Sequence, residues 1–418
     1  MNHTPRPDSV HAGKALPLDG IRILDLSRAL AGPWATALLG DLGAEIIKVE
    51  SSRGGDSSRS WPPFEGEHSL YFDSANRSKQ SVAVDLYTDE GRTIVWDLAM
   101  SSDVVVENFR PGVLSSMGLD PDALRQAKPG IIIASVSGFG ATGPLSQSAG
   151  LDQVAQGMSG LMSVTGEDAE HPLRVGVPII DMVSGIYLAL GVAAALCGRE
   201  RSCGGREVST SLLESALSLS AFQGQAYLSA GTVPEPQGNS HPVLAPYGVF
   251  QTADLPIIVA VGTERQWEQL CSLVGAPELA SDPAYCTGAL RSQNRSSLSV
   301  ALEEKLRAQP GNHWLAVLRE ASIPTGPIYT YAQAFADEQV KHLAMVTSVR
   351  RADGSHLPLL RGPLSLDRSP LAVRKAPPAL GEHTRDVLEE LGLPPRRVTA
   401  LIDAGVILTA DGREQAVA

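Results

Sequence analysis

Cysteine is scarce in this chain, and its spacing gives no sign of a metal centre. Four of the 418 residues are cysteine, and none forms a Cys-X-X-Cys pair or a Cys/His ligand pattern. We therefore predict reduced, structural thiols, as in cytosolic proteins, and no metal site. The four residues are Cys197, Cys203, Cys271 and Cys286.

Long apolar runs are also lacking. The most apolar stretch, 186–197, is too short to cross a bilayer. Residues 1–16 contain neither the apolar core of a signal peptide nor an Arg-rich amphipathic helix, so they predict a flexible tail. These absences predict a cytoplasmic protein with no membrane partner.

Common nucleotide and hydrolase motifs are missing from the places where they would act. The early glycines Gly32, Gly40 and Gly43 do not form the Gly-X-Gly-X-X-Gly fingerprint of dinucleotide-binding folds. The chain has no P-loop and no Gly-X-Ser-X-Gly elbow. A dinucleotide-dependent enzyme, a P-loop nucleotidase and a serine hydrolase are therefore disfavoured.

Acidic residues outnumber basic ones, which gives a net charge of −12. The two signs are interspersed rather than gathered in blocks, so nucleic acid is not an expected partner. With 43% hydrophobic residues, a chain of 418 residues can form two or three domains with sizeable cores. An acidic protein that binds an anionic ligand must gather its lysines and arginines locally.

Strand-like and helix-like segments alternate over the first 200 residues. A strand at 21–26, a helix at 34–42 ending before Gly43, and a strand at 45–50 make a βαβ unit. The alternation continues with strands at 81–86, 103–106 and 131–136 and helices at 92–100 and 120–126. This pattern predicts an α/β fold whose large domain is a Rossmann-like, doubly wound parallel sheet.

The composition changes near Gly231, where a Pro- and Gly-rich stretch at 232–246 predicts a long loop. Short strands and helices follow, typical of a smaller α+β domain. We expect the first part of the large domain at 17–225, the small domain at 226–330, and a return to the large domain with a C-terminal tail at 331–418. A terminal helix is expected around 384–391.

Three segments near predicted strand ends place a cation or an amide beside a flexible turn. They are Arg53-Gly-Gly, Asn76-Arg-Ser-Lys79 and Asn108-Phe-Arg-Pro-Gly112. Doubly wound sheets bind ligands beyond the carboxyl ends of their strands. Each segment by itself could be a solvated loop, but three along one edge favour a phosphorylated nucleotide ligand, bound through charge-assisted hydrogen bonds.

A single carboxylate, Asp181, lies in a run of small and apolar residues just before an apolar helical segment at 185–196. Such an aspartate can be an N-cap, where free N–H groups and the helix dipole favour its ionised form. It can also be a nucleophile presented on a tight turn. The local sequence leaves both interpretations open.

Two histidines stand at informative places. His241 lies in the loop opening the small domain, where it is either simply exposed or in contact with substrate. His383 directly precedes the predicted terminal helix, which favours capping or packing.

Taken in order, these segments resemble the class III coenzyme A-transferases, the family that includes formyl-CoA transferase and carnitine CoA-transferase. The resemblance covers nearly the whole chain, from about residue 17 to 384, and its layout is closest to the succinyl-CoA:glutarate branch. The segments that carry it are Ala31-Gly-Pro33, 41–50, 76–79, 106–112, 137–144, the Asp181 segment, 238–250 and 401–406.

The resemblance implies an enzyme that moves CoA from an acyl-CoA donor to a small carboxylate, and the branch favours a dicarboxylate. Asp181 matches the family's catalytic aspartate, which passes through an acyl anhydride and an aspartyl-CoA thioester. Backbone amides at the helix start, with a mobile glycine loop, would stabilise the oxyanions and exclude water. The family also implies an interlocked homodimer and no tightly bound cofactor, since CoA is a substrate.

The residues carried over from the family fall into two sets. The expected CoA contacts are Leu30, Ala31, Arg53, Arg77, Lys79, Val84, Asn108, Phe109, Arg110, Ser137, Gly138, Phe139 and Gly140. The expected glycine loop consists of Gly238, Asn239, Ser240 and His241.

The chain departs from the family pattern at two positions near the nucleotide phosphates. Ser51 and Ser116 stand where relatives often carry Arg or Lys, and Arg53 offers compensation for the first. The distal carboxylate of a dicarboxylate needs a cation or several donors. Arg77, Arg174 and His241 are the candidates, and the sequence does not rank them.

Two rival functions remain. The α-methylacyl-CoA racemases share this fold, and their Gly-His-Asp segment supplies a base for proton exchange. Here the matching segment is Gly150-Leu151-Asp152, and the missing histidine favours transfer over racemisation. A non-catalytic CoA-binding protein is the alternative from another class, because a fold alone does not secure activity.

Overall fold

The computed structural model describes residues 15–202 and 204–410, and these divide into two compact units. The first unit contains residues 15–161, 175–224 and 344–410, and the second contains 162–174 and 225–343. Most of the predicted N-terminal tail, the last eight residues and Cys203 lie outside the described residues. The segment 162–174 belongs to the second unit, whereas the sequence analysis assigned it to the large domain.

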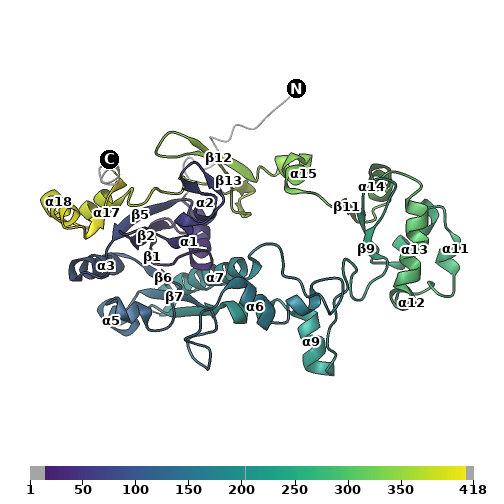
Figure 1. Cartoon of the computed structure of the whole chain (residues 1–418), viewed down its shortest axis with the longest axis horizontal. Helices are drawn as coiled ribbons and strands as arrows, with labels where there is room; N and C mark the ends of the chain where they lie inside the picture. Colours follow the sequence, from purple (N-terminus) through teal and green to yellow (C-terminus); the bar gives the residue numbers. More distant parts are fainter. Residues whose placement is uncertain (1–14, 203, 411–418) are drawn as a thin grey trace. The chain divides into compact units, whose positions relative to one another are not determined.

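A seven-stranded sheet forms the centre of the first unit (Figure 1). Its strand order is β16-β5-β2-β1-β6-β7-β8, and all neighbours pair in parallel except β16, which is antiparallel to β5. The strands are β1 (Arg22–Asp25), β2 (Glu45–Ser51), β5 (Lys79–Val84), β6 (Val104–Glu107), β7 (Ile132–Ser137), β8 (Glu207–Ser211) and β16 (Ile407–Leu408).

The parallel strands follow the doubly wound order 3-2-1-4-5-6 when numbered along the chain. The chain moves outward from β1 through β2 to β5, then crosses back to β6 on the other side of β1. The mixed α/β fold with a central, mainly parallel sheet is therefore as predicted. The point of reversal lies between β1 and β6, which is where such sheets form a ligand crevice.

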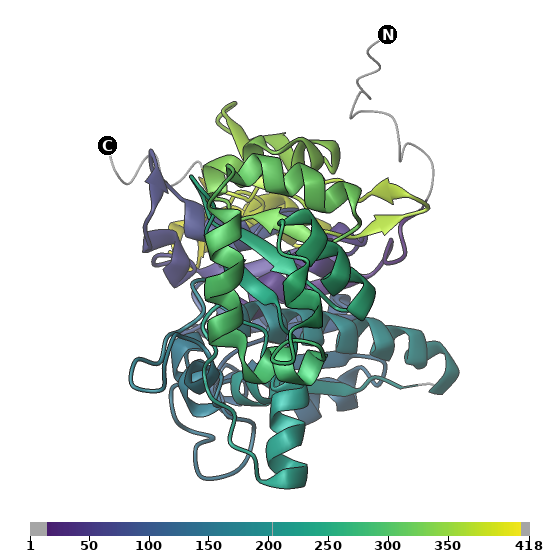
Figure 2. The same ribbon diagram turned by 90° about the vertical axis from the view of Figure 1, so that its right-hand side faces the viewer.

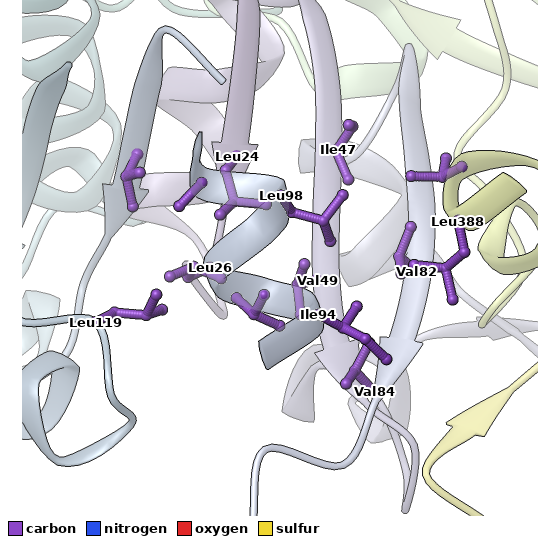
Figure 3. Close-up of a cluster of buried hydrophobic side chains, with 14 of the residues drawn as sticks. Leu24, Leu26, Ile47, Val49, Val82, Val84, Ile94, Leu98, Leu119 and Leu388 are labelled. Carbon is purple, nitrogen blue, oxygen red and sulfur yellow. The ribbon is translucent and has the colours of Figure 1, made fainter. Parts of the chain in front are cut away.

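Successive apolar side chains along each strand point to opposite faces of the sheet, and helices cover both faces to form two apolar cores. Ile23 of β1 faces the core formed with α1 (Ala31–Asp41) and α7 (Ile179–Ser202). Leu24 faces the opposite core, formed with α3 (Asp89–Ser101) and α17 (Thr384–Glu390). Figure 3 shows this second core, with Leu24 and Ile47 of the sheet near Leu98 of α3, and Val82 beside Leu388 of α17.

Most helix ends match local sequence signals. Helix α1 ends at Asp41, and Gly43 follows with a φ of +114°, a conformation that favours glycine. Helix α5 (Pro121–Ala127) begins with proline after the capping side chain of Asp120. Helix α7 differs, since it starts at Ile179 rather than near residue 185 and already contains Asp181 in its first turn.

Helix α7 is also the one described helix that is long and apolar enough to cross a membrane, over Ile179–Arg199. Length and composition alone are a weak indication, because the core helix of a soluble protein passes the same test. Here Leu188 and Val192 are fully buried in the core beneath the sheet. One side of α7 is therefore part of the protein interior.

The second unit is a small α+β body. Strands β9 (Tyr247–Phe250), β10 (Ile257–Ala260) and β11 (Thr325–Pro327) form an antiparallel sheet. Figure 2 turns the helices of this unit, coloured green, towards the viewer. Its core is built around Trp267 of α10 (Glu264–Leu273) and Trp314 of α14 (Gly311–Glu320).

The remaining elements of the chain are shorter or lie outside the two main sheets. The helices are α2 (Leu70–Ala75), α4 (Val113–Ser116), α6 (Asp152–Met158), α8 (Leu212–Ser218), α9 (Ala221–Ala230), α11 (Glu278–Ser281), α12 (Gly288–Gln293), α13 (Arg295–Leu306), α15 (Tyr331–Ala336), α16 (Glu338–His342) and α18 (Pro395–Asp403). The strands pair as β3 (Phe64–Glu65) with β4 (His68–Ser69), β12 (Val346–Arg350) with β13 (His356–Leu360), and β14 (Ser365–Leu366) with β15 (Ser369–Pro370).

Candidate active site

A cavity of about 320 Å³ lies in the first unit at the carboxyl ends of its central strands. This is the crevice that the strand order predicts. Of the expected CoA contacts, Val84 and Phe109 line it, and so do both departures from the family pattern, Ser51 and Ser116. The full lining is Leu26, Ser27, Arg28, Lys48, Val49, Glu50, Ser51, Gly55, Asp56, Val84, Leu86, Tyr87, Arg92, Phe109, Val113, Ser116 and Met117.

The loop after β1 is held rigidly at the mouth of this cavity. The Asn108 side chain pairs with both backbone groups of Arg28, accepting from its N–H and donating to its carbonyl, each at 2.8 Å. Lys48 Nζ donates to the carbonyl of Ser27 at 2.8 Å, and an Asp56 oxygen accepts from the N–H of Ala29 at 3.1 Å. These bonds hold Ala29 at a φ of +62°, an unfavourable conformation for a residue with a side chain.

Buried ion pairs support the loop from below. Lys48 contacts Asp56 at 2.9 Å and Lys79 contacts Asp25 at 2.9 Å, and all four side chains are almost fully buried. Burial lowers the pKa of Lys79 to about 8, against the opposing effect of Asp25. Because breaking one partner would leave a buried charge unpaired, this network fixes the carboxyl end of β1 to the start of β5, and the middle of β2 to the loop that follows it.

The structure separates the four cations of the segments predicted to bind phosphate, which are Arg53, Arg77, Lys79 and Arg110. The side chain of Arg53 is 70% exposed, pairs with Asp85 at 2.8 Å and lies over the Tyr87 ring. Arg77 is 1% exposed and paired with Asp41 at 2.6 Å, while Lys79 is fully buried. In this conformation Arg77 and Lys79 are paired with buried carboxylates, so Arg53 and the exposed Arg110 are the two that solvent or a ligand can reach.

Sequence reasoning missed all three cations that line the cavity, Arg28, Arg92 and Lys48, of which Lys48 is paired with Asp56. Arg28 lies over the ring of Phe109 at 4.9 Å from its centroid. It stands in a segment that directly follows a predicted strand, and this was the available signal. Arg92 was assigned only to a helix, and nothing in the local sequence showed that its side chain reaches back over the strand ends.

The loop after β7 carries the remaining predicted CoA contacts. Ser137 Oγ accepts from the N–H of Gly140 at 2.9 Å. A Cβ atom on Gly138 would lie 2.7 Å from the Cα of Gly150, so two chain segments meet here where only glycine fits. Residues 138–143 do spell Gly-X-Gly-X-X-Gly, yet the next helix begins only at Asp152, so the strand–turn–helix context of the dinucleotide fingerprint is absent.

Leu30, Ala31 and Arg110 complete the predicted set, and none of the three lines the cavity. Leu30 is the buried N-cap residue of α1, and Ala31 is buried in its first turn. Arg110 is exposed beyond β6. The direct contacts predicted for these three residues therefore stay predictions.

Asp181 occupies the third position of α7 and is half-buried. It is not the cap of its own helix, because Asp152 of α6 accepts the N–H groups of Ile180 and Asp181 at 2.7 and 3.1 Å. Among the described residues, no side chain donates a hydrogen bond or an ion pair to the Asp181 carboxylate. Burial, and then the charge of Asp152, raise its pKa to about 7, whereas the sequence predicted a site favouring the ionised form.

Gly185 sets the distance between α7 and α1 one turn beyond Asp181. A Cβ atom at this position would lie 2.6 Å from the carbonyl oxygen of Ala31 and 3.2 Å from the nitrogen of Ala35. The two helix backbones are therefore in direct contact. This contact ties the position of Asp181 to the first turn of α1, which follows the loop at the cavity mouth.

Tyr71 of α2 is a second residue that the sequence analysis missed. Burial raises the pKa of its phenol, and the negative charges of Asp181 and Asp152 raise it further. The phenol therefore lies within electrostatic range of both carboxylates. A phenol hydroxyl is a hydrogen-bond donor of the kind that stabilises oxyanions.

The predicted glycine loop lies in the second unit. Gly238 has a φ of +56° and donates its N–H to the carbonyl of Gly166 at 2.9 Å. The His241 ring stacks on Tyr247, and its Nδ1 accepts from the N–H groups of Val243 and Leu244 at 3.1 and 3.0 Å. With Nδ1 acting as an acceptor, the neutral ring carries its proton on Nε2. Asn239 and Ser240 form the turn between these residues.

His383 lies in the first unit, directly before α17. Its ring nitrogen Nδ1 accepts from the N–H of Ser81 at 3.3 Å, and burial lowers the pKa of the ring. The predicted packing role is therefore observed, while the side chain provides no cap for α17.

Comparisons with known proteins agree with this geometry. The sequence profile of CoA-transferase family III matches residues 18–384. A succinate–glutarate CoA-transferase of Agrobacterium fabrum is 38% identical over 92% of this chain and 98% of its own length. The human succinyl-CoA:glutarate CoA-transferase is 37% identical over 97% of this chain and 92% of its own.

A solved structure has the same fold. A CaiB/BaiF family protein from Brucella suis matches with a TM-score of 0.82 and 38% sequence identity, over 90% of this chain and all of that one. The profile, the relatives and the fold all lead to one family. This chain belongs to CoA-transferase family III, whose members take CoA thioesters as substrates.

Proposed function

We propose that this enzyme transfers CoA from a succinyl-CoA-like donor to a small dicarboxylic acid, with Asp181 as the covalent nucleophile. The observation that carries the proposal is the state of the Asp181 carboxylate. It is half-buried at the start of a helix, it accepts no hydrogen bond from the described side chains, and burial raises its pKa to about 7. A carboxylate with few stabilising partners is a better nucleophile than one held in an ion pair.

The proposed reaction proceeds through four exchanges at one side chain. An Asp181 oxygen attacks the thioester carbonyl, the C–S bond breaks, and an acyl anhydride forms while CoA thiolate leaves. The thiolate attacks the aspartyl carbonyl and releases the donor acid, which gives an aspartyl-CoA thioester. The acceptor carboxylate displaces the thiolate to form a second anhydride, and the thiolate then attacks the acceptor carbonyl and frees Asp181. No net proton is consumed.

The structure changes the expected source of oxyanion stabilisation. The first-turn N–H groups of Ile180 and Asp181 are occupied by Asp152, so they are not available to a tetrahedral intermediate in this conformation. We assign the role instead to the Tyr71 hydroxyl, which lies within electrostatic reach of Asp181. The loop 238–241 remains the proposed cover that excludes water.

The preference for a dicarboxylate rests on the relatives. Two relatives are named for succinate or succinyl-CoA and glutarate, and others are named for oxalate and mesaconate. Of the three candidates for the distal carboxylate, Arg77 is excluded by its buried pairing with Asp41. Arg174 and His241, both in the second unit, are the proposed contacts.

We further propose that a second copy of the chain completes the enzyme. Helices α6 and α7 expose large apolar side chains that a monomer would leave in water: Leu151, Val154, Met158, Ile186, Tyr187 and Leu190. Leu151 is 69% exposed and Leu190 is 63% exposed. Such a surface is typical of a subunit interface. Light scattering after size exclusion should give twice the mass of 44.0 kDa.

The test of the function combines trapping with substrate exchange. Incubation with acyl-CoA followed by borohydride or hydroxylamine should modify the peptide that contains Asp181, as detected by mass spectrometry. Asp181→Ala should abolish both trapping and CoA exchange, while Asp97→Asn, on the exposed side of α3, should change neither. Undiminished CoA exchange in Asp181→Ala would reject the proposal. Exchange of the α-proton with D₂O, without CoA transfer, would instead indicate an isomerase.

A panel of donors and acceptors would define the substrates. Succinyl-CoA and related thioesters are combined with C4–C6 dicarboxylates and with monocarboxylates of the same length, and CoA exchange is followed by mass spectrometry. We expect faster exchange with the dicarboxylates, because the second carboxylate gains contacts that a methyl group lacks. Equal rates for both acid types would argue against a dedicated distal site.

A further inference from the structure

The short helix α6 presents two polar side chains to the start of α7. Asp152 and Gln156 are one helical turn apart and point inward, and Gln156 is completely buried. The intervening residue Val154 points outward and is 44% exposed. A fully buried glutamine must find partners for both its amide oxygen and its nitrogen, since an unpaired buried polar atom costs about 1–3 kcal/mol.

The two side chains form a continuous hydrogen-bonded clamp. Gln156 Nε2 donates to one Asp152 oxygen at 2.6 Å, and Gln156 Oε1 accepts from the N–H of Val175 at 2.9 Å. The other Asp152 oxygen accepts from the N–H groups of Ile180 and Asp181. The clamp therefore holds the segment that leads into α7 at both ends, and Asp181 stands at one of those ends.

Asp152 also places a negative charge beside the proposed nucleophile. Among the described residues, Asp152 is the only charged group that shifts the pKa of Asp181. The charges of Asp181 and Asp152 both raise the pKa of the Tyr71 phenol of α2. Asp41 of α1 is paired with Arg77, Glu214 of α8 accepts from Ser211, and Glu207 of β8 is about half exposed. Asp56, which also influences Tyr71, is neutralised by Lys48.

We propose that Asp152 and Gln156 are positioning residues for CoA transfer, which orient Asp181 and whose negative charge favours its acylated form. The inference rests on the proposed role of Asp181. An ionised Asp181 is repelled by Asp152, whereas the anhydride and the aspartyl-CoA thioester are neutral at that position. Acylation therefore relieves the repulsion, just as protonation does. Burial and the charge of Asp152 raise the pKa of Asp181 for the same reason, because protonation also removes the negative charge from this side chain.

A double exchange separates the charge from the geometry. In the double variant Asp152→Asn, Gln156→Glu, the amide oxygen at position 152 still accepts from the N–H groups of α7. The amide N–H at position 152 donates to the carboxylate at position 156, whose other oxygen still accepts from the N–H of Val175. Each hydrogen bond of the clamp is retained, while the negative charge moves one helical turn away from Asp181. Asp152→Ala removes charge and clamp together. Glu214→Gln removes one negative charge from another helix packed on α7 and serves as the matched control.

The first measurement is independent of activity. Aspartate labelled with ¹³C at the side-chain carboxyl, compared between the wild type and Asp181→Asn, reports the titration of Asp181. We expect the double exchange to lower its titration midpoint by on the order of one pH unit, and Glu214→Gln to leave it unchanged. An unchanged midpoint in the double exchange would overturn the inference, whether or not Asp181 proves to be the nucleophile.

The second measurement follows the covalent intermediate. Enzyme is equilibrated with acyl-CoA at fixed pH, and the fraction carrying CoA on Asp181 is measured by intact-protein mass spectrometry. One pH unit corresponds to a tenfold equilibrium change, so we expect the ratio of acylated to free enzyme to fall by roughly tenfold in the double exchange. Equal ratios in wild type and double exchange would refute the charge effect. Full turnover by Asp181→Asn would instead refute the proposed function.

Discussion

Replacing Gly185 by alanine would place a methyl group between α7 and the first turn of α1. The added Cβ would lie 2.6 Å from the Ala31 carbonyl oxygen, 3.0 Å from the Trp34 ring and 3.2 Å from the Ala35 nitrogen. Two of these three atoms belong to the backbone, so no side-chain rotation can make room. The helices must move apart by several tenths of an ångström, and Asp181 moves with α7.

The expected cost divides unequally between stability and activity. Overpacking of this kind costs about 1–3 kcal/mol, while alanine gains about 1 kcal/mol over glycine within a helix. The net loss of unfolding free energy should therefore be at most about 2 kcal/mol. Turnover should fall much more, because a displacement of about 1 Å in reacting groups can cost on the order of a hundredfold.

The assay compares Gly185→Ala with Gly198→Ala, which changes the same helix at a position where a Cβ meets nothing within 4 Å. Urea unfolding should show Gly198→Ala equal to or more stable than the wild type, and CoA exchange should stay at the wild-type rate. Gly185→Ala should lose kcat by tenfold or more while remaining folded. Wild-type turnover in Gly185→Ala would refute the claim that the helix contact positions Asp181.

Three further predictions test individual side chains. Asp181→Asn should raise the melting temperature at pH 8 but not near pH 4. The raised pKa of Asp181 gives a contribution to stability that is fully present below the unfolded pKa of about 4 and is lost as the pH rises to about 7, and the neutral asparagine avoids this loss. Equal shifts in melting temperature at both pH values would contradict this. Arg77→Ala should lower the free energy of urea unfolding by about 3–5 kcal/mol, because it leaves Asp41 buried and unpaired. Arg53→Ala should lower it by under about 1 kcal/mol yet raise KM for the CoA ester. If Arg53→Ala were instead the more destabilising variant and Arg77→Ala the one that raises KM, Arg77 would again be a candidate ligand contact. His241→Phe should raise KM for dicarboxylates by about tenfold or more and leave monocarboxylates unaffected, as steady-state kinetics can show.

Local sequence patterns predicted β1, β2, β5, β6 and β7 of the large sheet, but not β8 or the antiparallel β16. Strands such as 45–50 and 131–136 are short apolar runs between turn residues, and the helices between them end at glycine or begin at a capping aspartate. These signals lie within a few residues of the element they define. The fold class follows from their alternation, because βαβ units can assemble only into a parallel sheet.

The start of α7 could not be predicted in the same way. Its cap is Asp152, which lies 28 and 29 residues away from the N–H groups it accepts. The same difficulty affects Arg77 and Lys79, because the carboxylates that bury them, Asp41 and Asp25, come from elsewhere in the chain. A cation beside a turn looks alike in sequence whether it points to a ligand or to the interior. The resemblance to the family identified Asp181 as the candidate nucleophile, and only the structure showed the side chains that surround it.

The discontinuous first unit has a consequence for how the chain folds as it leaves the ribosome. Strand β5 forms early in synthesis, but its outer edge is paired only when β16 emerges near the end of the described chain. Val387, Leu388 and Leu401, which cover the apolar face beside it, arrive equally late. Until then the nascent sheet exposes an open edge and a bare core, features that invite aggregation. The second unit, mostly continuous in sequence, can complete its fold before the first one closes.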